Sequence, residues 1–423
     1  MSSTRRADRP FDLVLWGATG FTGQLVAQYL HSHRRADSFR WAIAGRNRDK
    51  LLGLRQELGA TADELPILVG DSLDAQSLED MAAQTRVVCS TVGPYARYGS
   101  PLVAACIEQG SDYCDLTGEV HWVREMIDEH HHAAREAQVR IVHCCGFDSI
   151  PSDLGTAYLQ SLAMERFGEP FSEIRMLVWK VKGGISGGTA ASMADLVEKA
   201  ARDKAIRRIL ADPYSLAPKG QRSGPDSSSQ HTPRREGDIG TWSAPFIMAA
   251  VNEKIVRRSN ALLDYPYGSD FQYREATRVG PGLPGALRAG LMSAGIGAFS
   301  AAMALSPTRS LLKRFLLPDP GEGPDKEAID AGYFTLRFVG THRSSSSSPL
   351  MVDVSADADP GYGATSMMLG ESALSLALDD PSDQAPHLHR GGVLTPASAL
   401  GSMLIERLQQ AGMSFQLVDE SVL

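Results

Sequence analysis

The chain has few cysteines and no surplus of positive charge. Its cysteines are odd in number and show no CxxC spacing, so we expect reduced core thiols and neither a disulfide framework nor a cysteine zinc site. The five thiols are Cys89, Cys106, Cys114, Cys144 and Cys145. A net charge of −8 leaves no excess of cations to neutralise phosphates, so we expect no nucleic-acid partner.

Several other signals are absent as well. Residues 1–10 contain arginines but no apolar stretch, so no secretory signal is visible and a cytoplasmic location is expected. His130, His131 and His132 are consecutive, and side chains on a helix diverge by about 100° per residue, so no metal site is predicted from them. No tyrosine has a lysine four positions later, which excludes the Tyr-x-x-x-Lys mechanism.

A glycine-rich turn is the most informative feature that is present. The sequence GATGFTG (17–23) directly follows an apolar run at 11–16 and precedes a helix-like stretch. Three glycines at this spacing let the backbone approach a pyrophosphate, which binds at the amides of the helix N-terminus. The turn therefore predicts dinucleotide binding.

The end of the second expected strand indicates which dinucleotide. Residues 39–44 read as a buried strand and run into Gly45, Arg46, Asn47 and Arg48, where NAD-binding folds place a carboxylate for the ribose 2′-hydroxyl. Arg46 lies 23 residues after Gly23, at the place for a guanidinium that pairs with a 2′-phosphate. We predict NADP(H). A basic, solvated helix start remains the alternative.

Strands and helices alternate along the first third of the chain. This alternation predicts a doubly wound parallel sheet of the Rossmann type over residues 10–150. We expect a second α+β domain with a mostly antiparallel sheet over 151–358, and a helical segment over 359–423 that packs back on the first domain. Asp71 follows the third strand and is predicted to accept a hydrogen bond from the adenine amino group, with a helix N-cap as its alternative.

One apolar segment complicates the expectation of a soluble protein. Residues 289–305 carry no charge and are flanked by Arg288 and by Arg309, Lys313 and Arg314. A buried or hairpin helix would explain this stretch. A peripheral contact with the inner face of the plasma membrane would explain both the stretch and its basic flanks. Both alternatives remain open.

Ligands of doubly wound folds gather at the carboxyl ends of the strands. Three loops are expected there, at 90–101, 115–119 and 145–153. The side chains that we expect to converge on the hydride acceptor are Tyr95, Tyr98, Asp115, Glu119, Asp148 and Ser149. A reductase needs a general acid beside the hydride acceptor, and Tyr98 and Asp148 are the candidates. A hydrogen-bonded core tyrosine and a helix N-cap are their alternatives.

Several sequence blocks together resemble a known family. GATGFTG, AGR, TVGPYARYGSPLVAAC, DYCDLTGEVHWV, CGFDSIPSDLG and GGVLTPA are similar to the saccharopine dehydrogenase-like oxidoreductases, and especially to mycobacterial-type trans-acting enoyl reductases. The resemblance implies that the first block holds the NADPH phosphates and that the second block and the loop after the fourth strand contact the same cofactor. The residues concerned are Gly17, Thr19, Gly20, Phe21, Thr22, Gly23, Arg46, Asn47, Thr91, Gly93, Pro94 and Tyr95.

The same resemblance implies a substrate. Relatives of this kind reduce an enoyl double bond on polyketide chains in glycolipid biosynthesis, so we expect an acyl or polyketide substrate on a carrier protein or synthase, and a homodimer remains open. A saccharopine-type imine reductase is an alternative that Arg257 and Arg258 keep open. A non-catalytic NADP(H)-binding protein that associates with lipid is the other.

Overall fold

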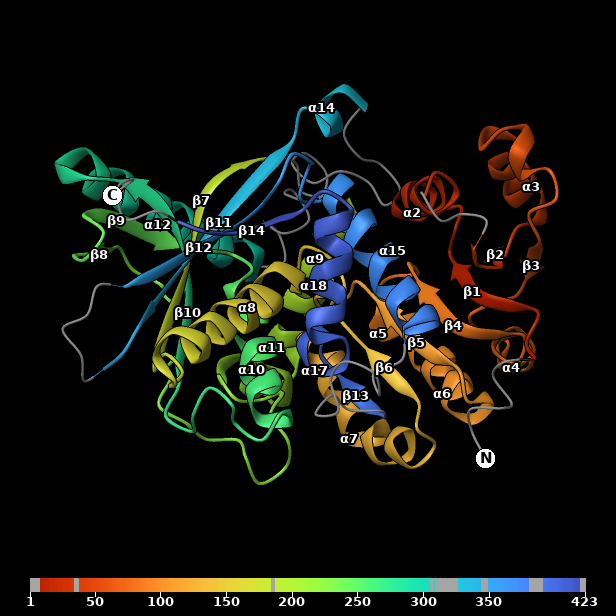
Figure 1. The fold of residues 1–423 in the computed structure, drawn as a ribbon, viewed down its shortest axis with the longest axis horizontal. Coiled ribbons are helices and arrows are strands. Elements are labelled where there is room, and N and C mark those ends of the chain that lie inside the picture. Colours follow the sequence, from red (N-terminus) through yellow and green to blue (C-terminus); the bar gives the residue numbers. More distant parts are fainter. Residues whose placement is uncertain are drawn as a thin grey trace.

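Two seven-stranded sheets organise the part of the chain that the computed structural model describes (Figure 1). The described residues are 8–33, 38–183, 187–304, 308, 326–343, 349–379 and 391–418. In Figure 1 the first sheet lies on the right and the second on the left, with α15 and α18 between them. The functional site must therefore be sought where the two sheets and these helices meet.

The first sheet is parallel throughout, in the order β13-β6-β5-β4-β1-β2-β3. Its strands are β1 (Phe11–Trp16), β2 (Trp41–Gly45), β3 (Ile67–Val69), β4 (Thr85–Ser90), β5 (Asp112–Asp115), β6 (Arg140–Val142) and β13 (Gly392–Leu394). The central strands β1, β2 and β5 are buried almost throughout, as parallel strands covered on both faces require. The expected Rossmann-type sheet is confirmed.

Helices connect these strands and cover both faces. They are α2 (Phe21–His31), α3 (Arg48–Glu57), η2 (Ala60–Ala62), α4 (Ala75–Ala82), α5 (Tyr95–Tyr98), α6 (Ser100–Gln109) and α7 (Val120–Glu136). Two of these helices have a side-chain N-cap, because Asn47 and Asp74 accept hydrogen bonds from first-turn amides of α3 and α4. Gly110 ends α6 in the left-handed conformation at φ +72°.

The second sheet is mostly antiparallel, in the order β14-β12-β11-β7-β10-β9-β8, with one parallel pair, β7 and β10. Its strands are β7 (Glu173–Lys182), β8 (Arg234–Glu236), β9 (Thr241–Pro245), β10 (Gln272–Gly280), β11 (Tyr333–Thr341), β12 (Leu350–Ala356) and β14 (Ser414–Leu417). This arrangement confirms the expected second α+β unit.

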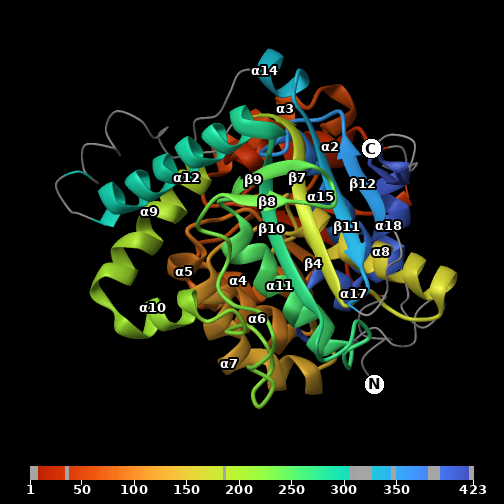
Figure 2. The same cartoon turned by 90° about the vertical axis from the view of Figure 1, so that its left-hand side faces the viewer.

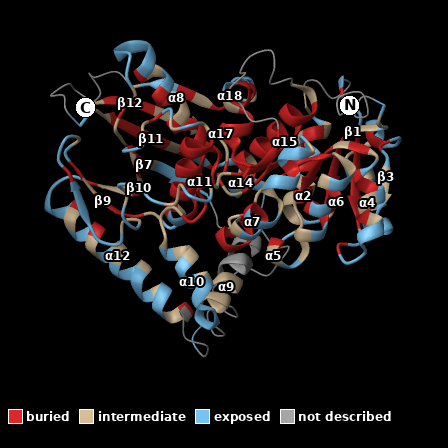
Figure 3. Cartoon of the chain, turned by 90° about the horizontal axis from the view of Figure 1, so that it is seen from below, coloured by how far each residue is buried: buried red, intermediate tan, exposed pale blue. Residues whose placement is uncertain are grey.

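The remaining helices pack on the second sheet, on the first sheet or on other helices (Figure 2). They are α8 (Ile150–Phe167), α9 (Gly187–Arg202), α10 (Lys204–Ala211), α11 (Ala249–Leu262), α12 (Gly282–Ala304), α14 (Lys326–Asp330), α15 (Gly363–Leu378), α17 (Pro396–Ala399) and α18 (Gly401–Gln410). Figure 3 shows that burial is concentrated in the strands and in α11, α15 and α17.

The C-terminal segment contributes to both sheets. Helix α15 packs on α2, and the Tyr29 hydroxyl donates a 2.6 Å hydrogen bond to Glu371 across that contact. Strand β13 then joins the first sheet beside β6, and β14 joins the second sheet beside β12. The sequence did not predict β13 as a strand, because three residues after a Gly-Gly pair show no strand pattern.

Helix α12 is exposed. Leu283, Leu287 and Leu291 are 81%, 70% and 75% exposed, and only 11% of its most apolar 18-residue stretch is buried. By length and composition it is the one helix of the described residues that could cross a membrane. The alternative of a buried helix is therefore wrong. Leu305 and the basic residues Arg309, Lys313 and Arg314 lie outside the described residues.

Close packing of α8 on the second sheet leads to a stability prediction. A Cβ at Gly155 would lie 2.5 Å from Cζ of the fully buried Phe338, whereas nothing lies within 4 Å of a Cβ at Gly53 of α3. Gly155→Ala should lower the free energy of unfolding by about 1–2 kcal/mol, because overpacking outweighs the gain in helix propensity. Gly53→Ala should raise it by about 0.5–1 kcal/mol. Urea denaturation measures both, and equal effects would contradict the packing.

Candidate active site

The turn between β1 and α2 requires glycine at two of its three glycine positions. Gly17 has φ +86°, and a Cβ there would lie 2.6 Å from Cγ2 of Val92. A Cβ at Gly23 would lie 2.2 Å from the carbonyl oxygen of Gly17. Gly20, between them, is exposed. Gly17 and Gly23 therefore allow the turn to pack closely, and the exposed Gly20 leaves the backbone open to a ligand.

The N-terminus of α2 is suited to bind a phosphate. Among the described residues no side chain caps this helix, and its first turn has no acidic residue. Its first amides and the positive end of the helix dipole are thus uncompensated by a side chain. Thr19 and Thr22 are half-buried beside the turn, and the Phe21 ring makes an edge contact with Tyr362 at 4.8 Å between centroids. These features fit a bound dinucleotide.

Three residues were predicted to bind the other end of the cofactor. Arg46 is exposed directly after β2, and no hydrogen bond or ion pair joins its side chain to another described residue. The Asn47 side chain accepts a 3.0 Å bond from the Lys50 amide and so caps α3. Asp71 accepts a 2.9 Å bond from the Leu73 amide, and Asp74 caps α4. The N-cap alternative for Asp71 is wrong, and the cofactor contacts of all three remain predictions.

The loop after β4 is held from inside the first domain. The Thr91 hydroxyl donates to the carbonyl of Trp16 or Gly17, at 3.2 and 3.1 Å. The Tyr95 hydroxyl donates to the Ser90 carbonyl at 3.1 Å, its ring stacks on Trp122, and burial raises its pKa well above the usual value. A contact of the Tyr95 side chain with the cofactor is therefore not supported. Gly93 is exposed and Pro94 half-buried, so their predicted contacts stay open.

The two carboxylates of the β5 loop have structural roles. Glu119 accepts 2.8 and 3.0 Å bonds from the amides of Tyr95 and Ala96. Asp115 accepts bonds from the amides of Thr117 and Cys144 and lies 2.7 Å from Nδ1 of His143. Neither carboxylate is therefore available to the substrate, contrary to the expectation that they converge on it. Each ties two neighbouring loops of the carboxyl edge together instead.

Asp148 follows β6 and, like Tyr98, is half-buried. Its Oδ1 is inaccessible and has no hydrogen-bond partner among the described residues. Burial raises its pKa from 3.8 to about 7. Ser149, rather than Asp148, is the N-cap of α8, so the N-cap alternative is wrong.

The loop that carries Asp148 lies where the two domains meet. The Phe147 amide donates a 3.1 Å hydrogen bond to Oγ1 of Thr365, in the first turn of α15. The Phe147 ring makes an edge contact with Phe334 of β11, at 5.0 Å between centroids. Asp148 is therefore placed at the junction of the first sheet, the second sheet and α15.

Tyr98 ends α5 and is half-buried. Its hydroxyl has no hydrogen-bond partner within the described ranges, so the alternative of a hydrogen-bonded core tyrosine is wrong. Strands β4 and β6 flank β5 in the parallel sheet, and the loops of Tyr98 and Asp148 therefore lie at the same edge. No hydrogen bond joins the two side chains in the described part of the chain.

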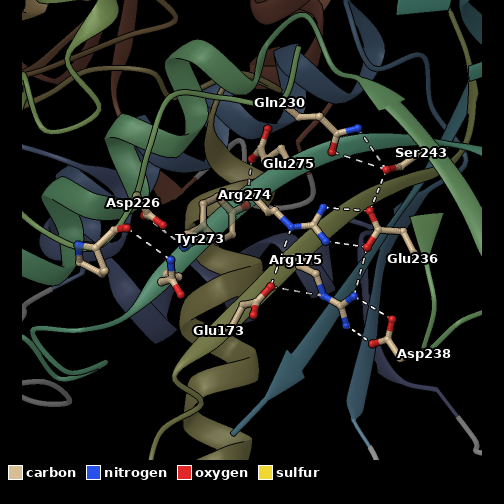
Figure 4. Close-up of polar contacts among 12 residues, drawn as sticks. Glu173, Arg175, Asp226, Gln230, Glu236, Asp238, Ser243, Tyr273, Arg274 and Glu275 are labelled. Carbon is tan, nitrogen blue, oxygen red and sulfur yellow. Dashed lines mark hydrogen bonds and ion pairs between the residues drawn. The ribbon is translucent and has the colours of Figure 1, made fainter. Parts of the chain in front are cut away.

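A polar pocket of about 330 Å³ lies in the second domain, beside β8 and β10 (Figure 4). Of its charged lining residues, Arg257 and Arg274 pair with acids, and the Arg274 pair belongs to a network that extends beyond the lining. Arg274 makes a two-pronged ion pair with Glu236, and Arg175 bonds both Glu236 and Asp238. Figure 1 places β8 and β9 at the opposite end of the molecule from β1 and α2. This network supports the second sheet and lies away from the reaction site.

The two arginines that kept an amino-acid substrate open are also engaged. Arg257 bonds Asp226 at 2.6 Å and Glu253 at 3.4 Å. Arg258 is buried and donates to the carbonyls of Leu216 and Val393. Burial and the nearby Arg124 and Arg222 lower the pKa of Arg258 to about 9. Both guanidinium groups make internal hydrogen bonds or ion pairs, so neither is free to bind a dicarboxylate.

Among the described residues, no group of three or more His, Cys, Asp and Glu side chains could hold a metal ion. Sequence reasoning missed two contacts of the site, the pair of His143 with Asp115 and the bond from Phe147 to Thr365. The first joins residues 28 apart and the second residues 218 apart. Neither has a local sequence signal.

Comparisons with known proteins define the class. Residues 13–142 match the family model of the saccharopine dehydrogenase NADP-binding domain. The described fold also resembles saccharopine dehydrogenase from Saccharomyces cerevisiae, with a TM-score of 0.51 over 96% of this chain and 99% of that chain. At 12% identity, that likeness concerns the fold alone. The class is an NADP-binding oxidoreductase, which confirms NADP(H) as the cofactor.

Relatives that align over nearly the whole chain define the family more narrowly. A Mycobacterium tuberculosis protein named as a candidate trans-acting enoyl reductase is 44% identical over 418 residues, covering 96% of this chain and 97% of its own. The trans-acting enoyl reductase of Mycobacterium ulcerans is 37% identical over the same shares of the two chains. The chain belongs to the saccharopine dehydrogenase-like family, among relatives of the trans-acting enoyl reductase type.

The exposed position of Arg46 yields a test of cofactor choice. If its guanidinium pairs with the 2′-phosphate, Arg46→Ala should weaken NADPH binding by about 1.5–3 kcal/mol, the scale of a charge-assisted hydrogen bond. NADH affinity should stay nearly unchanged. Titration calorimetry measures both nucleotides, with Arg135→Ala on α7 as the control for loss of an exposed arginine. Equal losses for NADPH and NADH would remove the role assigned to Arg46.

Proposed function

We propose that this protein is an NADPH-dependent enoyl reductase that acts in trans on an α,β-unsaturated acyl chain, held as a thioester on a carrier protein of a lipid-synthesising polyketide synthase. The observation that carries the proposal is the identity of 37% and 44% to relatives named for this reaction, over 96% of the chain. The site supports it with an uncapped turn suited to phosphate and a half-buried acid at the same sheet edge.

The cofactor would be held mainly by the first domain. Gly17, Gly20 and the first turn of α2 would bind its pyrophosphate, and Arg46 its 2′-phosphate. Thr91 would act indirectly, because its hydroxyl holds the turn. When bound, NADPH supplies the hydride that the β-carbon of the enoyl group receives.

The protein must then deliver a proton to the α-carbon. Asp148 suits this task, because a carboxyl with a pKa of about 7 keeps its proton near neutral pH, and its Oδ1 has no competing partner among the described residues. The C=C bond gains one hydride and this proton, and the carboxylate regains a proton from water. Tyr98 is the second candidate, because its hydroxyl is equally without a partner there.

The two alternatives from the sequence have less support. A saccharopine-type substrate would require free cationic groups, and Arg257 and Arg258 are both engaged in internal bonds. A non-catalytic role would give no use to the half-buried carboxyl of Asp148, whose Oδ1 has no partner among the described residues. Exposure of α12 fits lipid association equally well for a catalytic protein.

Substrate profiling tests the proposal directly. NADPH oxidation would be followed by the absorbance of the reduced nicotinamide. The substrates would be 2-enoyl thioesters on coenzyme A and on a carrier protein, beside saccharopine-type imines. We expect turnover of the enoyl thioesters and none of the imines. Reduction of imines alone would refute the enoyl assignment, and NADPH binding without turnover of either class would favour the non-catalytic alternative.

Proton delivery by Asp148 predicts a defined pH profile. Only the protonated carboxyl can act, so wild-type turnover should fall about tenfold per pH unit above pH 7, following the pKa of about 7. Asp148→Asn should slow turnover by about 10² to 10⁴-fold and abolish that limb. NADPH affinity should stay within about threefold. Tyr98→Phe provides the comparison, and an unchanged profile in Asp148→Asn would move the role to Tyr98 or to water.

Linkage provides a folding control for the same variant. Because the pKa of Asp148 is raised on folding, ionisation between the unfolded value and about pH 7 destabilises the folded state. The stabilising contribution is present at low pH and is lost as pH rises. Asp148→Asn cannot ionise, so it should melt no lower than wild type at pH 8. A lower melting temperature at that pH would show that the loss of turnover reflects misfolding.

A further inference from the structure

Helix α12 separates a narrow buried stripe from a broad apolar exposed face. Gly285, Ala289 and Met303 are buried, and the helix packs there against β9, β10 and α9. Leu283, Leu287 and Leu291 are largely exposed. They are spaced by four residues, so they form a ridge of about 12 Å along one side of the helix. Three such leucines in a row differ from the scattered apolar residues of ordinary surfaces.

The exposed face continues without charge beyond the leucines. Further exposed residues on it are Ala294, Gly295, Ala298 and Ala301. Arg288, which is also exposed, is the only charged residue of α12. An exposed face of this length, with one cation and no acid, favours contact with an apolar phase that has an anionic border.

Cationic side chains lie next to this helix. Three exposed basic residues occur on α10, namely Lys204, Arg207 and Arg208. Arg202, at the end of α9, pairs with Glu198 at 2.9 Å, and the exposed Asp203 caps α10. Helix α10 itself contains no acidic residue. Figures 2 and 3 both show α9 and α10 beside the C-terminal half of α12, and Figure 3 shows α10 and α12 along the same exposed border. Helix α10 thus carries three cations and no acid, although the whole chain has a net charge of −8.

We propose that α12 and α10 dock the protein on the surface of an anionic lipid bilayer. The leucine ridge inserts between the headgroups and the acyl chains, while the cations of α10 contact the headgroups. The helix lies flat on the membrane rather than across it, because its buried stripe stays packed on β9 and β10. This inference is independent of the reaction, since it uses no residue of the candidate active site.

Sedimentation with vesicles tests the docking. The full-length protein would be mixed at low salt with phosphatidylcholine vesicles that contain or lack phosphatidylglycerol. We expect binding to the anionic vesicles and weakening as salt is raised. The triple variant Leu283→Gln, Leu287→Gln, Leu291→Gln should bind at least about tenfold more weakly, because it removes the inserted apolar groups. Leu73→Gln, at a site 78% exposed in the first domain, is the matched control and should bind like wild type.

The cations are tested separately. Lys204→Gln with Arg208→Gln should weaken binding to anionic vesicles by about fivefold for each charge removed. Arg135→Gln with Arg166→Gln removes two exposed cations from α7 and α8 and should have little effect. An equal loss in both double variants would show that net charge alone is responsible, which would overturn the assigned surface.

Three further outcomes would overturn the proposal. These are absence of wild-type binding to anionic vesicles at low salt, undiminished binding of the leucine variant, and a wild-type dimer that the leucine variant converts to monomers without any vesicle binding. Sedimentation velocity detects the last of these. NADPH affinity equal to that of wild type would confirm that each variant is folded, and an inactive enzyme that still binds vesicles would leave the docking supported.

Discussion

The buried carboxylate of Asp115 is the contact on which the geometry of the site depends. Burying a carboxylate is costly unless hydrogen bonds compensate for the lost water. Asp115 meets this requirement with the amides of Thr117 and Cys144 and with the ring of His143. Two of these partners lie at the end of β6, directly before the loop of Asp148. The position of the candidate acid is therefore set by an interaction made one strand away.

The segment that runs from the end of β12 into the first turn of α15 also positions the candidate site. It contacts both halves of the candidate site, because Tyr362 packs on Phe21 in the nucleotide turn and Thr365 accepts a bond from Phe147. The cofactor turn and the acid loop thus share one support, although neither touches the other through its own side chains among the described contacts. A shift of this segment would change both at once.

Much of the fold could be predicted from the sequence, since strand periodicity and the GATGFTG turn are local signals. Asp148 could be predicted as well, because a residue after a parallel strand must lie at the carboxyl edge. The roles of Asp115 and Glu119 could not. Their partners are backbone amides up to 29 residues away. The residues next to a carboxylate in the sequence do not show whether it accepts structural hydrogen bonds or acts as a catalytic acid. Strand β13 escaped prediction because its pairing with β6 spans about 250 residues.

Because β13 (Gly392–Leu394) lies near the end of the chain, the first sheet stays incomplete until nearly the whole chain has been synthesised. A fragment that ended at residue 150 would leave one side of β6 without a neighbour, with its amide and carbonyl groups exposed in a row. Such unprotected edges pair readily with other chains. During synthesis, the nucleotide-binding half would therefore emerge long before the strand that shields it, and its solubility at that stage would depend on a chaperone or on rapid completion of the chain.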